Sequence, residues 1–99
     1  MELGADIHKA DNGGWTPLHG AAYNGRVEVV RMLVKGGADL NGVTNDGWIP
    51  LHYAARNGET EVVEVLLSLG ADRGKAAKNG KTPLDVADND EIKRLLQGP

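Results

Sequence analysis

An internal repeat of 33 residues is the feature that most constrains this chain of 99 residues. When residues 11–43 are laid over residues 44–76, 17 of the 33 positions are identical. Residues 77–97 continue in phase as a shortened third copy, and residues 1–10 resemble the tail of an earlier copy. A unit of this length cannot bury its apolar face alone, so neighbouring copies must stack. We therefore expect residues 1–99 to form one domain of stacked repeats.

Within one copy, the local signals predict two short helices. Thr16 supplies a hydroxyl cap, and Pro17 follows at the first helical position, where its missing N–H costs nothing. This helix has about eight residues, because glycine in the pair Asn24-Gly25 closes it in a left-handed conformation. A second helix is expected over residues 28–35, where valine and leucine recur at spacings of three and four.

The second copy repeats these signals with one departure. Its helices are expected after Pro50 and over residues 61–69. Ile49 stands in place of the Thr16 cap, and a lost cap costs about 0.5–2 kcal/mol unless the new side chain gains burial. Helices this short are marginal alone in water, so stacking must stabilise them. The Gly-, Asn- and Asp-rich stretches between copies are expected to form extended, hairpin-like loops.

The third copy has the pattern of a terminal unit. Asp85 takes the position of His19, and three residues are missing between the two helices. A second helix is expected over residues 88–97, with Asp88 and Glu91 as its capping box. Its outer face is polar, which suits a unit with no neighbour beyond it. The start of the chain has no matching cap, and self-association through that end is one consequence that we consider.

Two sequence strings resemble a known family. Gly-Trp-Thr-Pro-Leu-His-x-Ala-Ala-x-Asn-Gly and Gly-Ala-Asp-x-Asn are similar to the ankyrin repeat. The resemblance implies an all-α repeat solenoid, an elongated stack of helix-turn-helix pairs with β-hairpin loops projecting from one side. It also implies protein–protein binding through the hairpin tips and the concave face of the first helices. In that family, the histidine at positions 19 and 52 forms hydrogen bonds around the helix start, and hairpins are hydroxylated at the asparagine that corresponds to Asn41.

Composition and charge exclude several functional classes. The chain has no cysteine, which removes disulfides and thiolate sites and is compatible with a reducing compartment. Its formal net charge of −3, without a dense Lys/Arg stripe, argues against general nucleic-acid binding. Its apolar runs fall short of the ~18 residues that span a bilayer. We expect an intracellular, cytoplasmic protein that does not insert into membranes.

The candidate catalytic and metal-binding residues fit structural roles better. His19 and His52 lie 33 residues apart at equivalent positions, and neither has a second ligand three or four residues away. Ser68 is the only serine and has no nearby histidine for a triad. Residues 74–82 superficially suggest a phosphate loop, but five residues separate the glycines instead of four. We predict no enzymatic activity, no cofactor and no metal.

The positions that vary between copies are expected to line up about 10 Å apart along one face, near the usual distance between packed helices. Because aromatic residues and arginine dominate binding hot spots, the preferred contacts are at Trp15, Tyr23, Trp48 and Arg56. The two tryptophans have a second interpretation, in which they only pack on the neighbouring hairpin. Further contacts are expected at Asn45, Asp46, Lys78 and Lys81.

Positive charge gathers on the last hairpin. Residues 73–99 hold six bases and four acids, whereas residues 1–72 hold five bases and ten acids. We expect a protein partner with acidic groups beside an apolar anchor, although a solvated hairpin would explain the same charges. The basic residues of this hairpin are Arg73, Lys75, Lys78 and Lys81.

Three functional hypotheses follow. The first is a non-enzymatic, monomeric module that presents a rigid surface to a protein partner. The second is a structural or engineered scaffold without a natural partner, suggested by the regular copies and the short start. The third makes the chain a hydroxylation substrate at Asn41, which mass spectrometry of natively produced protein distinguishes from the other two.

Overall fold

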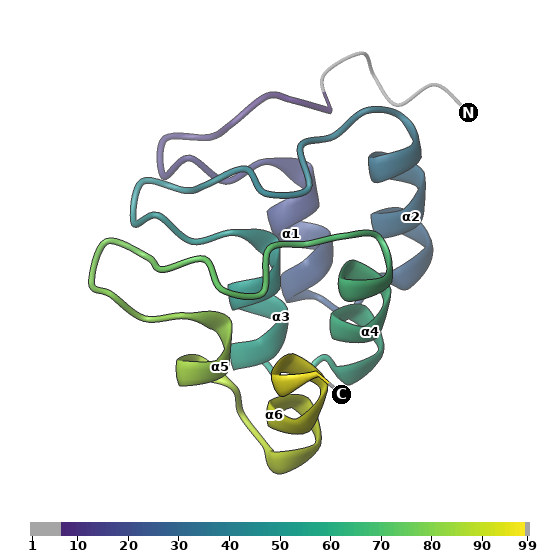
Figure 1. Ribbon diagram of the computed structural model, residues 1–99. Helices are drawn as coiled ribbons and strands as arrows, with labels where there is room; N and C mark the ends of the chain where they lie inside the picture. The colour runs from purple at the N-terminus through teal and green to yellow at the C-terminus, as the bar shows by residue number, and fades with distance from the viewer. Residues whose placement is uncertain (1–6, 99) are drawn as a thin grey trace.

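A computed structural model describes residues 7–98, and the helices in this range follow one another in pairs (Figure 1). The first helices of the pairs, α1, α3 and α5, pack in one row, and the second helices, α2, α4 and α6, pack in a row behind it. The loops project from the side opposite the second row (Figure 1). The two rows of paired helices confirm the predicted all-α repeat solenoid, and the stack measures 37 × 26 × 19 Å. The helices are α1 (Pro17–Tyr23), α2 (Val27–Lys35), α3 (Pro50–Arg56), α4 (Thr60–Ser68), α5 (Pro83–Val86) and α6 (Asp90–Gln97).

The start of each first helix is closed by a side chain three residues past the cap. The Thr16 N–H donates to His19 Nδ1 at 3.0 Å, and the Thr16 hydroxyl accepts from the His19 N–H. Asp85 forms the corresponding hydrogen bond in α5, where its carboxylate accepts from the Thr82 N–H at 3.0 Å. The histidine-to-aspartate change in the third copy therefore preserves the cap of α5.

The structure explains how Ile49 replaces a capping threonine. Its side chain is fully buried, and its N–H donates to His52 Nδ1 at 3.0 Å. Isoleucine lacks the hydroxyl that Thr16 uses, but the histidine half of the cap remains. Burial of the isoleucine side chain thus compensates for the missing hydroxyl acceptor.

The last helix begins later than the sequence predicted. The cap of α6 is Asn89, whose Oδ1 accepts from the Ile92 N–H at 2.9 Å, so the predicted start with Asp88 and Glu91 as a capping box was wrong. The Asp88 N–H instead donates to the Ala55 carbonyl of α3 at 3.0 Å. This contact with another copy holds Asp88 outside the helix.

The loops are hairpin-shaped turns that stack on one another. Within residues 7–98 none of them forms a regular strand. The Asn45 N–H donates to the Gly13 carbonyl at 2.9 Å, and the next loop repeats this contact. Gly14 has φ +84°, and a Cβ there would lie 2.7 Å from the Asn45 nitrogen. Glycine is therefore required for neighbouring loops to approach this closely.

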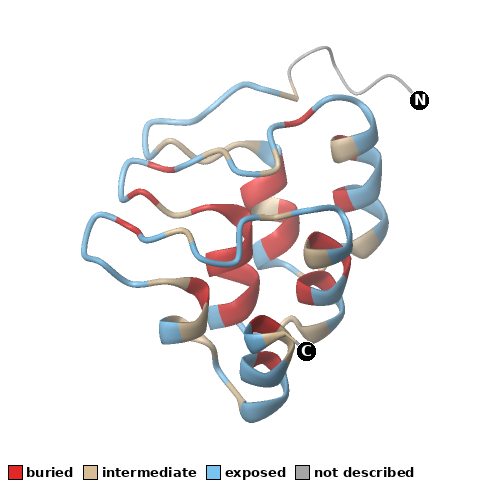
Figure 2. Cartoon of the chain, in the orientation of Figure 1, coloured by how far each residue is buried: buried red, intermediate tan, exposed pale blue. Residues whose placement is uncertain are grey.

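The buried residues lie mainly between the two rows of helices (Figure 2). At equivalent positions, Val62 and Val65 of α4 are 1% and 5% exposed, whereas Val29 and Met32 of α2 are 38% and 39% exposed. Self-association through the N-terminal end of the stack stays a prediction. The expectations for residues 1–6 fall outside the described residues. Within residues 7–98, no helix has the length and apolar character needed to cross a bilayer.

We predict that Ile49→Ala lowers the free energy of unfolding by about 2–5 kcal/mol, because it removes a fully buried side chain. Ile49→Thr should retain more stability than Ile49→Ala, since the threonine hydroxyl can accept from the helix start as Thr16 does. Urea unfolding followed by circular dichroism measures both variants. Equal stability of the two would contradict the proposed compensation.

Candidate functional site

Four aromatic side chains form a continuous cluster between the loops and the first helices. The centres of the Trp15 and Tyr53 rings lie 4.2 Å apart, and the centres of the Trp48 and Tyr53 rings lie 5.0 Å apart. Tyr23 stands edge-on to Trp15 at 5.7 Å. The Arg56 guanidinium lies over the Trp48 ring, 5.8 Å from its centre. We call Trp15, Tyr23, Trp48, Tyr53 and Arg56 the aromatic groove.

Tyr53 joins the two tryptophans, and sequence reasoning missed it. The residue is 8% exposed, and its hydroxyl lies 3.0 Å from the hydroxyl of the buried Thr44. Burial raises the pKa of the Tyr53 phenol above its usual 10.0, so the group stays protonated. The sequence signal that could have identified Tyr53 is that it takes the position of Gly20 in the preceding copy, so a ring replaces a glycine at this point of the stack.

The two repeated histidines connect the first helices to the loops beside the groove. His19 Nε2 donates to the carbonyls of Gly42 and Trp48 at 2.8 and 3.1 Å, and His52 Nε2 donates to the Lys81 carbonyl at 3.0 Å. Desolvation by burial lowers the pKa of both imidazoles below 6.5. The predicted structural role of these histidines is confirmed.

Two cavities open along the groove, and Tyr53 and Arg56 line both. The larger, about 510 Å³, lies between the first two copies, and the smaller, about 290 Å³, lies between the second and third. Trp15, Tyr23 and Asn57 complete the larger cavity, while Asp46, Trp48, Lys78 and Asn79 complete the smaller one.

The structure brings most of the predicted contacts together. Six of the eight line one of the two cavities: Trp15, Tyr23, Asp46, Trp48, Arg56 and Lys78. The Asn45 amide instead donates to the Asn12 carbonyl at 2.8 Å and ties two loops together. Lys81 is exposed, and its carbonyl holds His52. Arg73 donates to the Leu96 carbonyl at 3.2 Å, so this basic residue is engaged at the end of α6.

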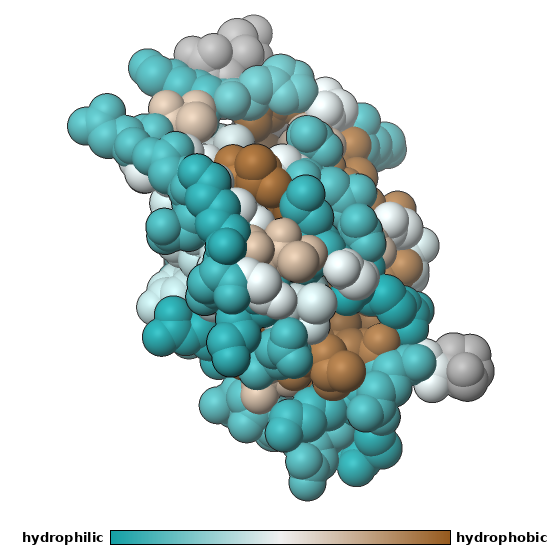
Figure 3. Space-filling view, turned by 60° about the vertical axis from the view of Figure 1, so that its left-hand side comes forward, coloured by the Kyte–Doolittle hydropathy of each residue, from teal (hydrophilic) through white to brown (hydrophobic). Residues whose placement is uncertain are grey.

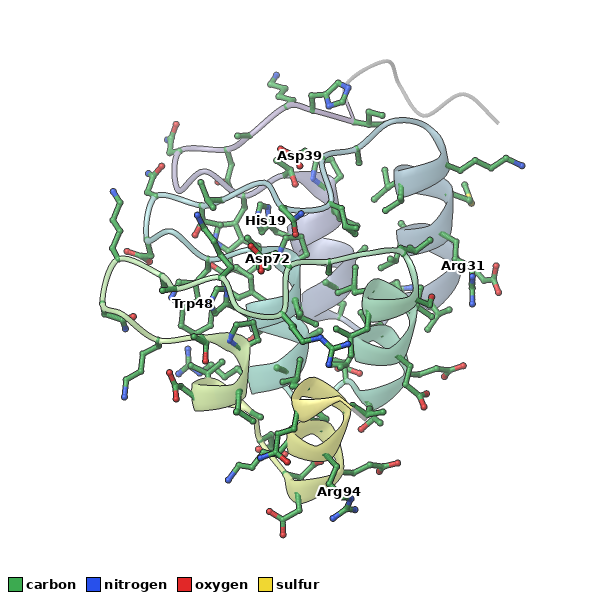
Figure 4. The ribbon with its side chains drawn as sticks, in the orientation of Figure 1. His19, Arg31, Asp39, Trp48, Asp72 and Arg94 are labelled. Atoms are coloured by element: carbon green, nitrogen blue, oxygen red, sulfur yellow. The ribbon has the colours of Figure 1, made fainter. Side chains whose placement is uncertain are left out.

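The views with side chains locate the groove on the loop side. Trp48 lies beside α3 among the loops, whereas Arg31 and Arg94 extend away from α2 and α6 (Figure 4). Hydrophilic residues cover the loop tips that come forward in Figure 3, and hydrophobic residues show in separate areas between them. Among the described residues, no group of three or more His, Asp or Glu side chains is placed to hold a metal ion.

Comparison with known proteins shows the family. The model for ankyrin repeats in three copies matches residues 1–77 and 45–98, so the chain belongs to the ankyrin-repeat family. Repeats of this family are generally protein–protein interaction modules. The chain is similar to human and mouse protein phosphatase 1 regulatory subunit 27, each 47% identical over 34 residues. Each match covers 34% of this chain and 22% of the length of the relative.

Folding stability should fall as the pH drops below about 6.5. The unfolded chain protonates its histidines near that pH, whereas burial lowers the pKa of His19 and His52 in the folded chain. The unfolded state then binds more protons, so the full stability is present above the unfolded pKa and declines below it. Urea unfolding at about pH 7.5 and about pH 5 tests this direction. The exposed His8 provides a control, because His8→Ala should keep the pH dependence. Equal urea midpoints of the parent chain at the two pH values would refute the role of the buried histidines.

A double-mutant cycle tests the link between Tyr53 and Thr44. Tyr53→Phe and Thr44→Val should each destabilise the chain by about 1–3 kcal/mol, because each leaves a buried hydroxyl without this partner. The double variant should lose about 1 kcal/mol less than the sum of the single losses. Thermal unfolding measures the coupling, and unchanged tryptophan fluorescence in Tyr53→Phe checks that the rings stay stacked. Strictly additive losses would show that the two hydroxyls do not interact.

Proposed function

We propose that this chain is a non-enzymatic adaptor that presents the aromatic groove to a protein partner. The observation that carries the proposal is the partly exposed aromatic row held by the stacked loops and helices. Tyr23 is 43% exposed, and the tryptophans keep part of their surface accessible while their rings contact the buried Tyr53 at a tilt. A surface ordered before binding loses little conformational entropy when a partner arrives.

The charges beside the groove support a partner with acidic groups next to an apolar anchor. Arg56 and Lys78 line the smaller cavity, while rings dominate the larger one. Tryptophan, tyrosine and arginine contribute large contact areas at binding hot spots. With no cysteine, the chain is compatible with the reducing cytoplasm, where we place this binding event.

The phosphatase subunit supports the adaptor role only in general terms. Its name describes a regulatory protein, and the 34 matching residues are about the length of one 33-residue copy. A match of that length reflects the shared scaffold. The partner of this chain is therefore argued from its own groove.

The hydroxylation hypothesis has less support. Asn41 is exposed, but its Oδ1 accepts from the Asp72 N–H of the next loop at 2.9 Å. The same residue donates its backbone N–H to Asp39 at 3.0 Å. Asn41 therefore already has a role in joining the loops, which explains an asparagine at this position without modification.

We predict that Tyr23→Ala combined with Arg56→Ala lowers capture of partner proteins by about tenfold or more, because it truncates two hot-spot side chains. The measurement is quantitative pull-down from cells that naturally produce the chain. The parent residues are exposed, so the helicity and melting temperature should change little.

Leu69→Ala combined with Arg31→Ala is the matched control, since Arg31 is exposed on α2 and Leu69 is exposed just after the end of α4. This control should capture the same proteins as the parent chain. Equal capture by the groove variant would reject the groove as the binding surface. Capture of nothing by the parent chain would favour the scaffold hypothesis.

A further inference from the structure

The two cavities of the groove differ in chemistry although they share a wall. Tyr53 and Arg56 form the shared wall. The larger cavity adds the rings of Trp15 and Tyr23, and the smaller adds Trp48 with the charged Lys78 and Asp46. We propose that the groove binds an extended peptide segment that carries an apolar side chain and a carboxylate about three residues apart. This inference rests on the proposed function and adds the chemistry and spacing of the ligand.

The larger cavity suits the apolar side chain. Trp15 and Tyr23 meet at an interplanar angle of 77°, and Tyr53 closes the space between them. The hydrogen bond between Tyr53 and Thr44 fixes the position of the tyrosine ring. An aromatic or aliphatic side chain entering here would cover ring surface without having to order the rings first.

The smaller cavity suits a carboxylate. Arg56 lies over the Trp48 ring, and this contact uses its charge but none of its N–H donors. A planar guanidinium held in this way can donate two parallel hydrogen bonds to a carboxylate. Lys78 lines the same cavity and adds a second positive charge.

Asp46 selects against other charged ligands. Because Asp46, Arg56 and Lys78 all line the smaller cavity, it has a net charge of about +1. One carboxylate neutralises that charge, whereas a phosphate group carries about −1.5 to −2 and would leave uncompensated negative charge beside Asp46. A cationic side chain would meet Arg56 and Lys78. The balance of charges therefore favours Asp or Glu in the ligand over phosphoserine or lysine.

The spacing follows from the repeat. One cavity lies between the first and second copies and the other between the second and third, so they are one repeat apart. Neighbouring helices pack about 10 Å apart. An extended chain in the polyproline II conformation advances about 3.1 Å per residue with about three residues per turn, so side chains three positions apart project from the same side. An apolar residue and an acidic residue about three positions apart therefore reach both cavities.

The probe is a peptide with blocked termini that carries one Phe and one Glu three residues apart in a Gly/Ser background. It is made in both residue orders, since either chain direction brings the two side chains to the two cavities. Because the peptide lacks tryptophan, the fluorescence of Trp15 and Trp48 reports its binding to the 99-residue chain. Matched peptides replace Glu with Gln, Glu with phosphoserine, or Phe with Ala.

We expect the Phe/Glu peptide to bind about tenfold or more tightly than the Gln and Ala peptides, since a charge-assisted pair and a buried ring each contribute on that scale. Arg56→Gln should remove the preference for Glu over Gln, and Arg31→Gln should leave it unchanged. Lys78→Gln should reduce the preference by a smaller factor, because lysine lacks the planar fork.

Three results would overturn the inference: equal binding of the Glu and Gln peptides, tighter binding of the phosphoserine peptide, or no binding of the Phe/Glu peptide at millimolar concentration. The pull-down separates this failure from that of the proposed function. If the Tyr23/Arg56 double variant loses its protein partners while the peptides show no preference for Glu, the groove still binds protein and only the carboxylate assignment is wrong.

Discussion

One buried histidine in each full copy connects the elements on which the stack depends. His19 accepts the Thr16 N–H at the start of α1 and donates to the carbonyls of Gly42 and Trp48, which belong to the next loop. A single side chain thus closes a helix and fixes the neighbouring loop against it. His52 connects Ile49 of its own cap to the Lys81 carbonyl in the same way. Because both rings are fully buried, these bonds form out of reach of competing water.

Regular stacking converts sequence differences between copies into a binding surface. Equivalent residues lie side by side along the stack, so a change from Gly20 to Tyr53 adds a ring beside Trp15. The change from Tyr23 to Arg56 adds a cation at the corresponding position one copy later. The groove therefore owes its position to the repeated residues and its chemistry to the residues that are not repeated.

The fold was predictable because its signals are local and occur in every copy. Proline at the first helical position, with threonine before it in two of the three copies, and glycine after the helix in the two full copies mark the helices without knowledge of the tertiary structure. The start of α6 was missed because a contact with Ala55 in another copy holds Asp88 outside the helix. Tyr53 was missed for a related reason, because its role depends on rings from two neighbouring loops. The contact of Arg73 with the Leu96 carbonyl likewise joins elements that are distant in sequence.

The two interpretations of the tryptophans, packing and binding, are compatible in this structure. Trp15 contacts Tyr53 and also lines the larger cavity, and Trp48 contacts Tyr53 and lines the smaller one. Packing on one side of each ring removes its rotational freedom, so the side that faces the cavity is already positioned before a ligand arrives. The stability of the groove and its capacity to bind therefore have the same origin. Substitutions at the tryptophans would change both at once, whereas changes at the exposed Tyr23 and Arg56 act on the binding surface with little effect on folding.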